Sequence, residues 1–535
     1  MNPEAHQVPE AHQVPEAHQA PDARHAPEVH QAPDARRTAD AGGGLVHLTA
    51  RELAAAIRAR ELSAREVVQA HLDRIEQVNG AVNAVVTLTA ERALDEARAA
   101  DERTVRGAPL GPLHGLPVAH KDTHDTRGIR TTYGTPLLAD NVPDRDELIV
   151  ERIRGAGAIT IGKTNVPEFA AGSHTVNPVF GATRNPYDLT RSAGGSSGGA
   201  AAALACGMHP LADGSDMGGS LRNPASFCNV VGLRPSPGRV PTWPDATPWS
   251  TMAVQGPMAR NVADAALLLS VVAGPDPRSP ISLETPGSAF AGALERDLTG
   301  LRIAWSPDLG GAVPVDREVT DVLAPAVTAF AGLGCTVEEA CPDLSGADEV
   351  FRTFRAWQFH LALGALTQTA ADRIKPSLVR NVQQGRALTG IDLERATVLH
   401  GELFHRVREF FERYDALVLP TSQVVPFPVE SEYPDTVGGV AMTDYLEWMR
   451  SAYLVSATGS PALSVPAGFT PAGLPVGLQI VGPHRADLHV LQIGHAFEQA
   501  TRHGERRPEP GVTRPDGRVL GRHESFGASG QEHRR

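Results

Sequence analysis

The feature that most constrains this fold is a pair of glycine and serine clusters on either side of an alanine-rich run. Arg191 to Ala225 reads RSAGGSSGGAAAALACGMHPLADGSDMGGSLRNPA. Glycine accepts positive φ at little cost, so such clusters can turn peptide N–H groups towards a small bound group. The run from Ala200 to Cys206 has no polar side chain, which predicts a buried helix with its N-terminus at Ser196 to Gly199. A flexible linker is the other interpretation of such clusters, but these ones bracket apolar sequence.

Length, charge and cysteine usage limit the class of protein. The chain has 535 residues, a hydrophobic fraction of 41% and a formal net charge of -13. The negative charge argues against nucleic-acid and anionic-membrane partners, which need concentrated Lys and Arg. The four cysteines form no C-x-x-C pair, no run approaches the ~20 apolar residues of a membrane span, and the first residues lack the order of a secretory signal. We therefore expect a cytoplasmic protein with no disulfide framework.

Both ends of the chain are predicted to be disordered. Residues 2 to 37 repeat the hexapeptide P-[ED]-[AV]-[HR]-x-x, with the prolines at Pro3, Pro9, Pro15, Pro21, Pro27 and Pro33. A proline every six residues interrupts any helix, and the apolar content is too low for a core, so we assign 1–43 as disordered. Its histidines imply no fixed metal geometry. Residues 506–535 are polar and rich in Gly, Pro and Arg, which predicts a second disordered tail and leaves 44–505 as one domain.

Strand and helix patterns alternate between these ends. Capping boxes predict helices over 50–60 and 64–78, and apolar spacing predicts another within 392–413. Short apolar runs predict strands at 158–161, 301–305 and 416–419. The stretch LHGLPVAHKD, from Leu113, predicts a buried strand that ends in Lys121 and Asp122. The alternation favours an α/β fold, a single large domain with a mixed β-sheet covered by helices.

Three motifs suggest other chemistries. Gly157 to Thr164 (GAITIGKT) matches the phosphate-binding pattern, but its would-be loop is itself an apolar strand. Gly194 to Gly198 (GGSSG) matches a nucleophile elbow, although the residues before it are polar and turn-like; an α/β-hydrolase-type esterase remains an alternative. The nearby histidines lack metal-site spacing and are interpreted as hydrogen-bonded structural residues: His114, His120, His124, His174 and His209.

Lys121 points to another chemistry. In a desolvated pocket the pKa of a lysine falls, and the neutral amine becomes a general base. Such a base could take the proton of a serine, directly or through a second hydroxyl. The second cluster, Asp216 to Ser220 (DMGGS), would offer consecutive N–H groups beside that serine as an oxyanion hole.

The chain resembles the amidase signature hydrolases. The likeness covers most of 45–502 and rests on GLPVAHKD, GKTNVPEF, FGATRNPYD, the cluster pair GGSSGG and GSDMGGSLRNPA, YDALVLPT and GSPALSVPAG. The resemblance implies the amidase signature fold, with helices on both faces of the sheet. It also implies that Ser220 is the nucleophile, that Ser196 carries a cis peptide and relays protons, and that Lys121 is the base. The backbone amides of Met217, Gly218 and Gly219 would line the oxyanion hole.

Two positions depart from the family pattern. Met217 stands where a threonine often precedes the paired glycines, and its side chain would narrow the pocket. Pro167 replaces an acidic or small residue, which affects a local loop. Asp216 and Arg222, often paired in the family, are interpreted as scaffold.

The sequence therefore predicts an amidase that hydrolyses a carboxylic amide through a seryl acyl-enzyme to a carboxylate and ammonia or an amine. A Ser-Ser-Lys triad needs neither a metal nor an organic cofactor. The expected partner is a small-molecule amide, and a homodimer is left open. The main alternative is an amidotransferase A-type subunit that releases ammonia for a partner complex. Specificity is expected to depend on segments such as Phe351 to Thr389.

Overall fold

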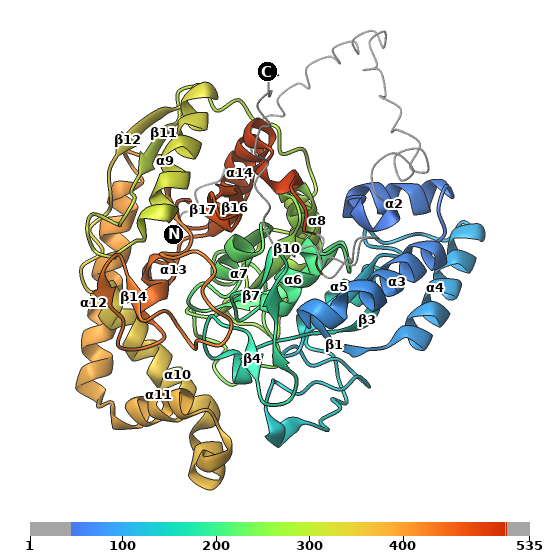
Figure 1. Cartoon of the computed structure of the whole chain (residues 1–535), viewed down its shortest axis with the longest axis horizontal. Helices are drawn as coiled ribbons and strands as arrows, with labels where there is room; N and C mark the ends of the chain where they lie inside the picture. Colours follow the sequence, from blue (N-terminus) through green and yellow to red (C-terminus); the bar gives the residue numbers. More distant parts are fainter. Residues whose placement is uncertain (1–43, 509, 511–535) are drawn as a thin grey trace, which may run out of the picture.

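A computed structural model describes residues 44–508 and 510, and Figure 1 shows how their helices and strands are arranged. The predicted repeat in 1–43 and nearly all of the predicted C-terminal tail lie outside the described residues. Contacts of the folded domain continue just beyond residue 505. The Arg506 carbonyl accepts a hydrogen bond from Tyr187 Oη at 2.7 Å, and the Arg506 guanidinium lies 4.0 Å from the centre of the Phe469 ring.

The centre of the fold is an eight-stranded mixed sheet with the order β12-β11-β13-β17-β16-β9-β10-β8. β11 is parallel to β12 and β13, and the other neighbouring pairs are antiparallel. Two of its strands, β11 and β13, are those predicted over 301–305 and 416–419. Along the chain the strands are β8 (Leu211–Asp216), β9 (Val231–Arg234), β10 (Val254–Ala259), β11 (Arg302–Trp305), β12 (Thr336–Glu339), β13 (Ala416–Pro420), β16 (Ala462–Phe469) and β17 (Pro475–Val481).

Helices cover both faces of this sheet. In β13, Val418 belongs to one hydrophobic cluster while Leu417 and Leu419 belong to another, because successive side chains of a strand point to opposite faces. The Val418 face packs against α8 (Val262–Val272), α9 (Arg317–Gly332) and α14 (Asp487–Thr501). The opposite face packs against α7 (Arg222–Phe227), α10 (Ala347–Ala370), α12 (Gly390–Phe410) and α13 (Arg450–Ala457). The predicted fold class is confirmed.

A small three-stranded sheet, β1-β3-β2, lies beside α3 and α4 in the blue part of Figure 1. Its strands are β1 (Val85–Leu88), β2 (Pro117–Lys121) and β3 (Ile159–Thr164), and β2 runs parallel to β3. β2 is fully buried and ends at Lys121, as the sequence predicts. β3 contains the GAITIGKT residues that would have to form a phosphate-binding loop, so that interpretation is excluded.

The remaining helices flank these sheets. The capping boxes at Thr49 and Ser63 are present, and they begin α2 and α3 where the sequence places them. The helices are α2 (Ala50–Ala59), α3 (Ala64–Val82), α4 (Ala90–Val105), α5 (Leu148–Gly155), α6 (Gly198–Ala205) and α11 (Pro376–Ala387). The shorter strands are β4 (Val176–Asn177), β5 (Gly181–Ala182), β6 (Arg184–Asn185), β7 (Asp188–Ser192), β14 (Thr436–Val437) and β15 (Val440–Ala441). The 3-10 helices are Leu45–His47, Pro136–Leu138, Glu168–Ala170, Gly287–Phe290, Ala371–Arg373, Glu447–Met449 and His503–Glu505.

Helices α10, α11 and α12 project together from the body of the molecule, at the lower left of Figure 1. α10 contacts α11 and α12 and also packs on α13, which ties the projection to the sheet. Within 44–508 no helix combines the length and the apolar character needed to cross a membrane.

Candidate active site

The Lys121 amine lies at the end of β2, fully buried, between two serine hydroxyls. Its Nζ is 2.8 Å from Ser196 Oγ and 2.9 Å from Ser215 Oγ. Burial lowers the pKa of Lys121 to about 7, and the negative charges of Asp216, Asp213 and Glu147 only partly oppose that shift. At neutral pH a large fraction of this amine is therefore uncharged and able to accept a proton.

Ser196 is positioned by the first glycine and serine cluster. The Gly195–Ser196 peptide bond is cis, as the family resemblance implies. Ser173 Oγ donates a hydrogen bond to the Gly195 carbonyl at 2.9 Å. Two residues later α6 begins, and all eight of its residues are buried, which confirms the helix predicted from the alanine run.

The N-terminus of α6 joins the two clusters to each other. The Ser197 N–H donates to the Ser220 carbonyl at 3.1 Å, the Gly198 N–H to Thr175 Oγ1 at 3.2 Å, and the Gly199 N–H to the Asn165 carbonyl at 3.2 Å. These groups would otherwise lack partners at a helix end. The sequence predicts that the N–H groups at the start of this helix face a bound group. In the structure they are hydrogen bonded to protein atoms, one of which is the Ser220 carbonyl oxygen.

Ser220 closes the second cluster and is 8% exposed, whereas Lys121 is 0% exposed. The Ser220 hydroxyl forms no hydrogen bond to Ser196 or to any other described residue. It is therefore available to a ligand. The paired glycines before it are sterically required. A Cβ on Gly218 would lie 2.8 Å from Phe351 Cζ, and one on Gly219, at φ +111°, would lie 2.6 Å from Ala452 Cβ.

The backbone amides of the second cluster are not equivalent. The Gly219 N–H donates to Asp216 Oδ1 at 2.9 Å. Among the described residues, the N–H groups of Met217, Gly218 and Ser220 have no hydrogen-bond acceptor. Two of the three predicted oxyanion-hole amides are therefore free, and the third is already used inside the loop.

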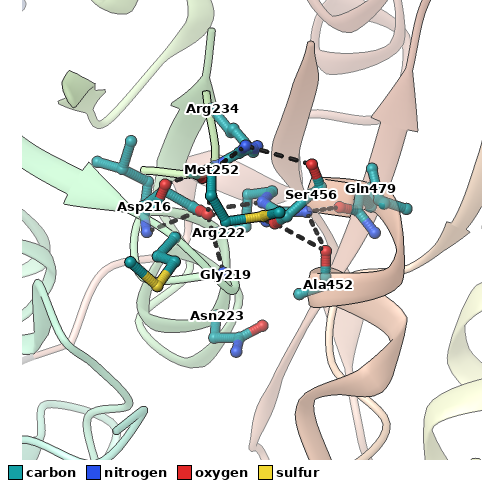
Figure 2. Close-up of polar contacts among 12 residues, drawn as sticks. Asp216, Gly219, Arg222, Asn223, Arg234, Met252, Ala452, Ser456 and Gln479 are labelled. Carbon is teal, nitrogen blue, oxygen red and sulfur yellow. Dashed lines mark hydrogen bonds and ion pairs between the residues drawn. The ribbon is translucent and has the colours of Figure 1, made fainter. Parts of the chain in front are cut away.

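A buried ionic cluster holds this loop in place (Figure 2). Arg222 donates to both carboxylate oxygens of Asp216, at 3.0 and 2.9 Å, and Arg234 lies 3.3 Å from Asp216 Oδ1. Burial disfavours ionisation of Asp216, but these two guanidinium groups hold its pKa well below the ordinary value. Arg222 also donates to the Ala452 carbonyl at 2.9 Å and Ser456 Oγ at 2.7 Å, which ties the loop to α13. The predicted pair of Asp216 and Arg222 is present.

A second buried layer supports β2. Asp213 accepts hydrogen bonds from the Lys121 N–H at 2.8 Å and from His120 Nδ1. Each of the histidines near the predicted motifs is buried and hydrogen bonded, as its structural interpretation requires: His114 to Thr104, His120 to Asp213, His124 to Glu147, His174 to Ser192 and His209 to the Leu211 carbonyl.

Two residues of the site were not predicted from the sequence. Asp213 and Ser215 lie two apart in β8, so both point from one face of that strand towards β2 and Lys121. The alternation of polar residues in an otherwise buried strand, LADGSD, is the signal that could have found them.

The chain is similar to known amidases over most of its length. The amidase family model matches residues 66–491. The chain is 37% identical to an acylamidase of Rhodococcus erythropolis, with 86% of this chain and 97% of the relative covered. It is 38% identical to the A-type subunit of the glutamyl-tRNA(Gln) amidotransferase of Moorella thermoacetica, with 88% and 99% covered. The crystal structure of a bacterial aryl acylamidase of the amidase signature family superimposes with a TM-score of 0.80 at 31% identity, covering 86% of this chain and 98% of that one.

The family model spans well over half of the chain, and the curated relatives are covered almost completely. The chain therefore belongs to the amidase signature family, and it is an amide-hydrolysing enzyme. The alternative of an α/β-hydrolase-type esterase is not supported, because the GGSSG motif lacks the structural context that a nucleophile elbow needs. Such an elbow would need to follow a strand of the central sheet, whereas β7, the strand before GGSSG, belongs with β6 to a separate two-stranded sheet.

Proposed function

We propose that this enzyme hydrolyses a small-molecule amide through a seryl acyl-enzyme, with Ser220 as nucleophile, Ser196 as proton relay and Lys121 as base. The observation that carries the proposal is the 2.8 Å contact between the buried Lys121 amine and the Ser196 hydroxyl, on a segment held by hydrogen bond to Ser220. A free lysine with its pKa near 10.4 would be protonated at pH 7, whereas one near 7 is available as a base.

The first half of the reaction forms the acyl-enzyme. Ser220 Oγ attacks the carbonyl carbon, its proton passes to Ser196 Oγ, and the Ser196 proton passes to Lys121 Nζ. A neutral amine has one lone pair and two N–H groups. With one N–H donated to Ser215 Oγ, the lone pair remains free to accept the Ser196 proton, and Ser215 is proposed to act as a positioning residue.

The tetrahedral intermediate then collapses. The C–N bond breaks as the relay runs in reverse and delivers a proton to the leaving nitrogen, because an amide anion is too basic to leave. Water attacks the Ser220 ester with the same base assistance and releases the carboxylate. No step requires a metal or an organic cofactor.

The free N–H groups of Met217 and Gly218 are proposed to bind the developing oxyanion. The Gly219 N–H would contribute a shared hydrogen bond, because Asp216 Oδ1 already accepts from it. The Ser220 N–H has no acceptor within the described chain and is a further donor. The Asp216 cluster keeps these dipoles oriented before substrate binds, which is the condition under which such donors accelerate reactions.

The alternative function is an A-type amidotransferase subunit that releases ammonia for a partner complex. The identity of 38% to such a subunit favours keeping it. The two functions share the serine chemistry and differ in whether a partner protein is needed.

The experiment that tests the proposal is turnover by the purified chain alone. A panel of aliphatic, aryl and dicarboxylic amides, with released ammonia or amine as readout, is expected to include substrates turned over without any added protein. Ammonia release only from glutamine, and only in the presence of partner subunits, would support the amidotransferase function instead.

A further inference from the structure

Helix α10 brings a buried arginine against the loop from Asp216 to Ser220, which carries the proposed oxyanion-hole amides. Arg355 is 3% exposed, and its Nη1 lies 3.3 Å from the Met217 sulfur. Phe351, four residues earlier on the same helix, is the residue that a Cβ on Gly218 would touch. Residues four apart on a helix share a face and lie about 6 Å apart along its axis. One face of α10 therefore contacts the loop at two neighbouring residues, Met217 and Gly218.

No carboxylate neutralises Arg355 within the described part of the chain. Its Nη2 donates to Tyr445 Oη at 2.8 Å, and its Nε has no hydrogen-bond partner. The remaining neighbours are aromatic, with the guanidinium carbon 4.5 Å from the Phe359 ring centre, 5.6 Å from that of Tyr445 and 6.0 Å from that of Phe351. Cation–π contacts offset part of the desolvation cost, but they leave most of the five N–H donors unmatched.

The other three buried arginines of the described residues differ in this respect. Arg222 and Arg234 both contact Asp216, and Arg239 pairs with Asp487 at 3.0 Å. A buried charge normally has such a partner, since an unpaired one is costly. The contact of Arg355 with the active-site loop is through Met217, whose thioether is a weak hydrogen-bond acceptor on a flexible side chain. A stronger acceptor could displace it.

We infer that Arg355 binds a carboxylate of the substrate, so that the preferred substrates are amides that carry a carboxylate a few bonds from the scissile carbonyl. A planar guanidinium with unused N–H groups matches a carboxylate in a two-point hydrogen bond. The carboxylate would take the position of the Met217 sulfur. This inference rests on the proposed function and adds the substrate class to it.

The test compares matched pairs of amides. In the first pair the carboxylate is on the acyl side, and the monoamide of glutaric acid is compared with the neutral pentanamide. In the second pair the carboxylate is on the amine side, and N-hexanoylglycine is compared with the neutral N-propylhexanamide. The ratio of kcat/KM, charged over neutral, is expected to be at least about tenfold in one pair, because a hydrogen bond to a charged group is worth about this factor or more.

In Arg355→Met this ratio is expected to fall about 10- to 100-fold, mainly through KM. Arg355→Lys, which keeps a charge but not the planar donors, is expected to recover only part of it and serves if the methionine variant does not fold. Arg352→Met is the matched control on the same helix, because Arg352 is already paired with Asp444 at 2.7 Å. Its ratio is expected to equal that of the wild type. General damage to the pocket would lower both members of a pair equally and leave the ratio unchanged.

Two failures can be told apart. Turnover of neutral amides with no preference for a carboxylate in either pair, or an unchanged ratio in both Arg355 variants, would overturn the role of Arg355 alone. Absence of any turnover by the isolated chain would overturn the proposed function itself.

Discussion

Two buried lysines on paired strands of one small sheet, Lys121 and Lys163, differ in what surrounds their amines. Burial lowers the pKa of both. Lys121 Nζ lies between the hydroxyls of Ser196 and Ser215, whereas Lys163 Nζ lies against the His124 carbonyl and, at 2.8 Å, Thr126 Oγ1. A carbonyl oxygen can only accept, and Thr126 Oγ1 itself donates to the His124 carbonyl at 3.0 Å.

Desolvation alone therefore does not make a buried lysine a base. Lys121 contacts a hydroxyl that can pass it a proton, and that hydroxyl lies on the segment hydrogen bonded to Ser220. Lys163 contacts atoms that require its N–H groups as donors, so it holds the chain after β2 in place. The register explains the separation. Lys163 is opposite His120, and Thr164 is opposite Lys121, so the two amines project from opposite faces of the β2–β3 pair.

The largest effect is expected for Lys121→Met. Removal of the base should lower kcat/KM by about 10²- to 10⁴-fold, the usual contribution of general base catalysis, while the apolar replacement fills the buried space. Steady-state kinetics and circular dichroism of the variant check this. Activity within a factor of three of the wild type would remove Lys121 from the mechanism.

Lys163→Met should show the opposite pattern. Loss of the hydrogen bonds to the His124 carbonyl and Thr126, and of the positive charge near Asp122, should lower the free energy of unfolding by roughly 2–4 kcal/mol. Below its melting temperature the variant should keep kcat/KM within about threefold of the wild type. Denaturant unfolding and kinetics at a permissive temperature measure the two quantities. An activity loss as large as that of Lys121→Met would contradict the assignment of a structural role to Lys163 and a catalytic role to Lys121.

The pH dependence of activity also distinguishes the two lysines. Because only neutral Lys121 accepts a proton, kcat/KM should rise with pH through an apparent pKa of about 7 and level off above it. The value at pH 6 should be about tenfold below the plateau. The acid limb should be kept in Lys163→Met and lost from the residual activity of Lys121→Met. A limb that persists without Lys121 would assign it to another group.

The smallest effect is expected for Ser215→Ala. This variant removes one hydrogen bond that orients the Lys121 amine, and a single bond of this kind corresponds to about 3- to 10-fold in kcat/KM. Ser422→Ala is a matched control, since Ser422 is a buried serine whose hydroxyl has no hydrogen-bond partner in the described chain. Equal losses in both variants would deny Ser215 a specific positioning role.

The sequence predicted the elements that carry the chemistry better than the contacts between them. A buried strand ending in lysine, a buried alanine helix and two glycine clusters are local patterns, and each is present. Three contacts of the site depend on how the chain packs. They are the contacts of Ser215 with Lys121, of Arg355 with Met217, and of the Gly219 N–H with Asp216. Arg355 and Met217 are separated by 138 residues, so only tertiary structure brings them together. Register, loop conformation and the choice among neighbouring donors follow from packing, which one sequence does not display.

The identity of the serine that becomes acylated is the central element of the proposed mechanism. A fluorophosphonate probe followed by peptide mapping should place the adduct on Ser220, and Ser220→Ala should not be labelled at all. Ser196→Ala should be labelled slowly, because loss of a proton relay costs about 10²- to 10⁴-fold but leaves the attacking atom in place. An adduct on Ser196, with full activity in Ser220→Ala, would contradict the mechanism proposed for this enzyme.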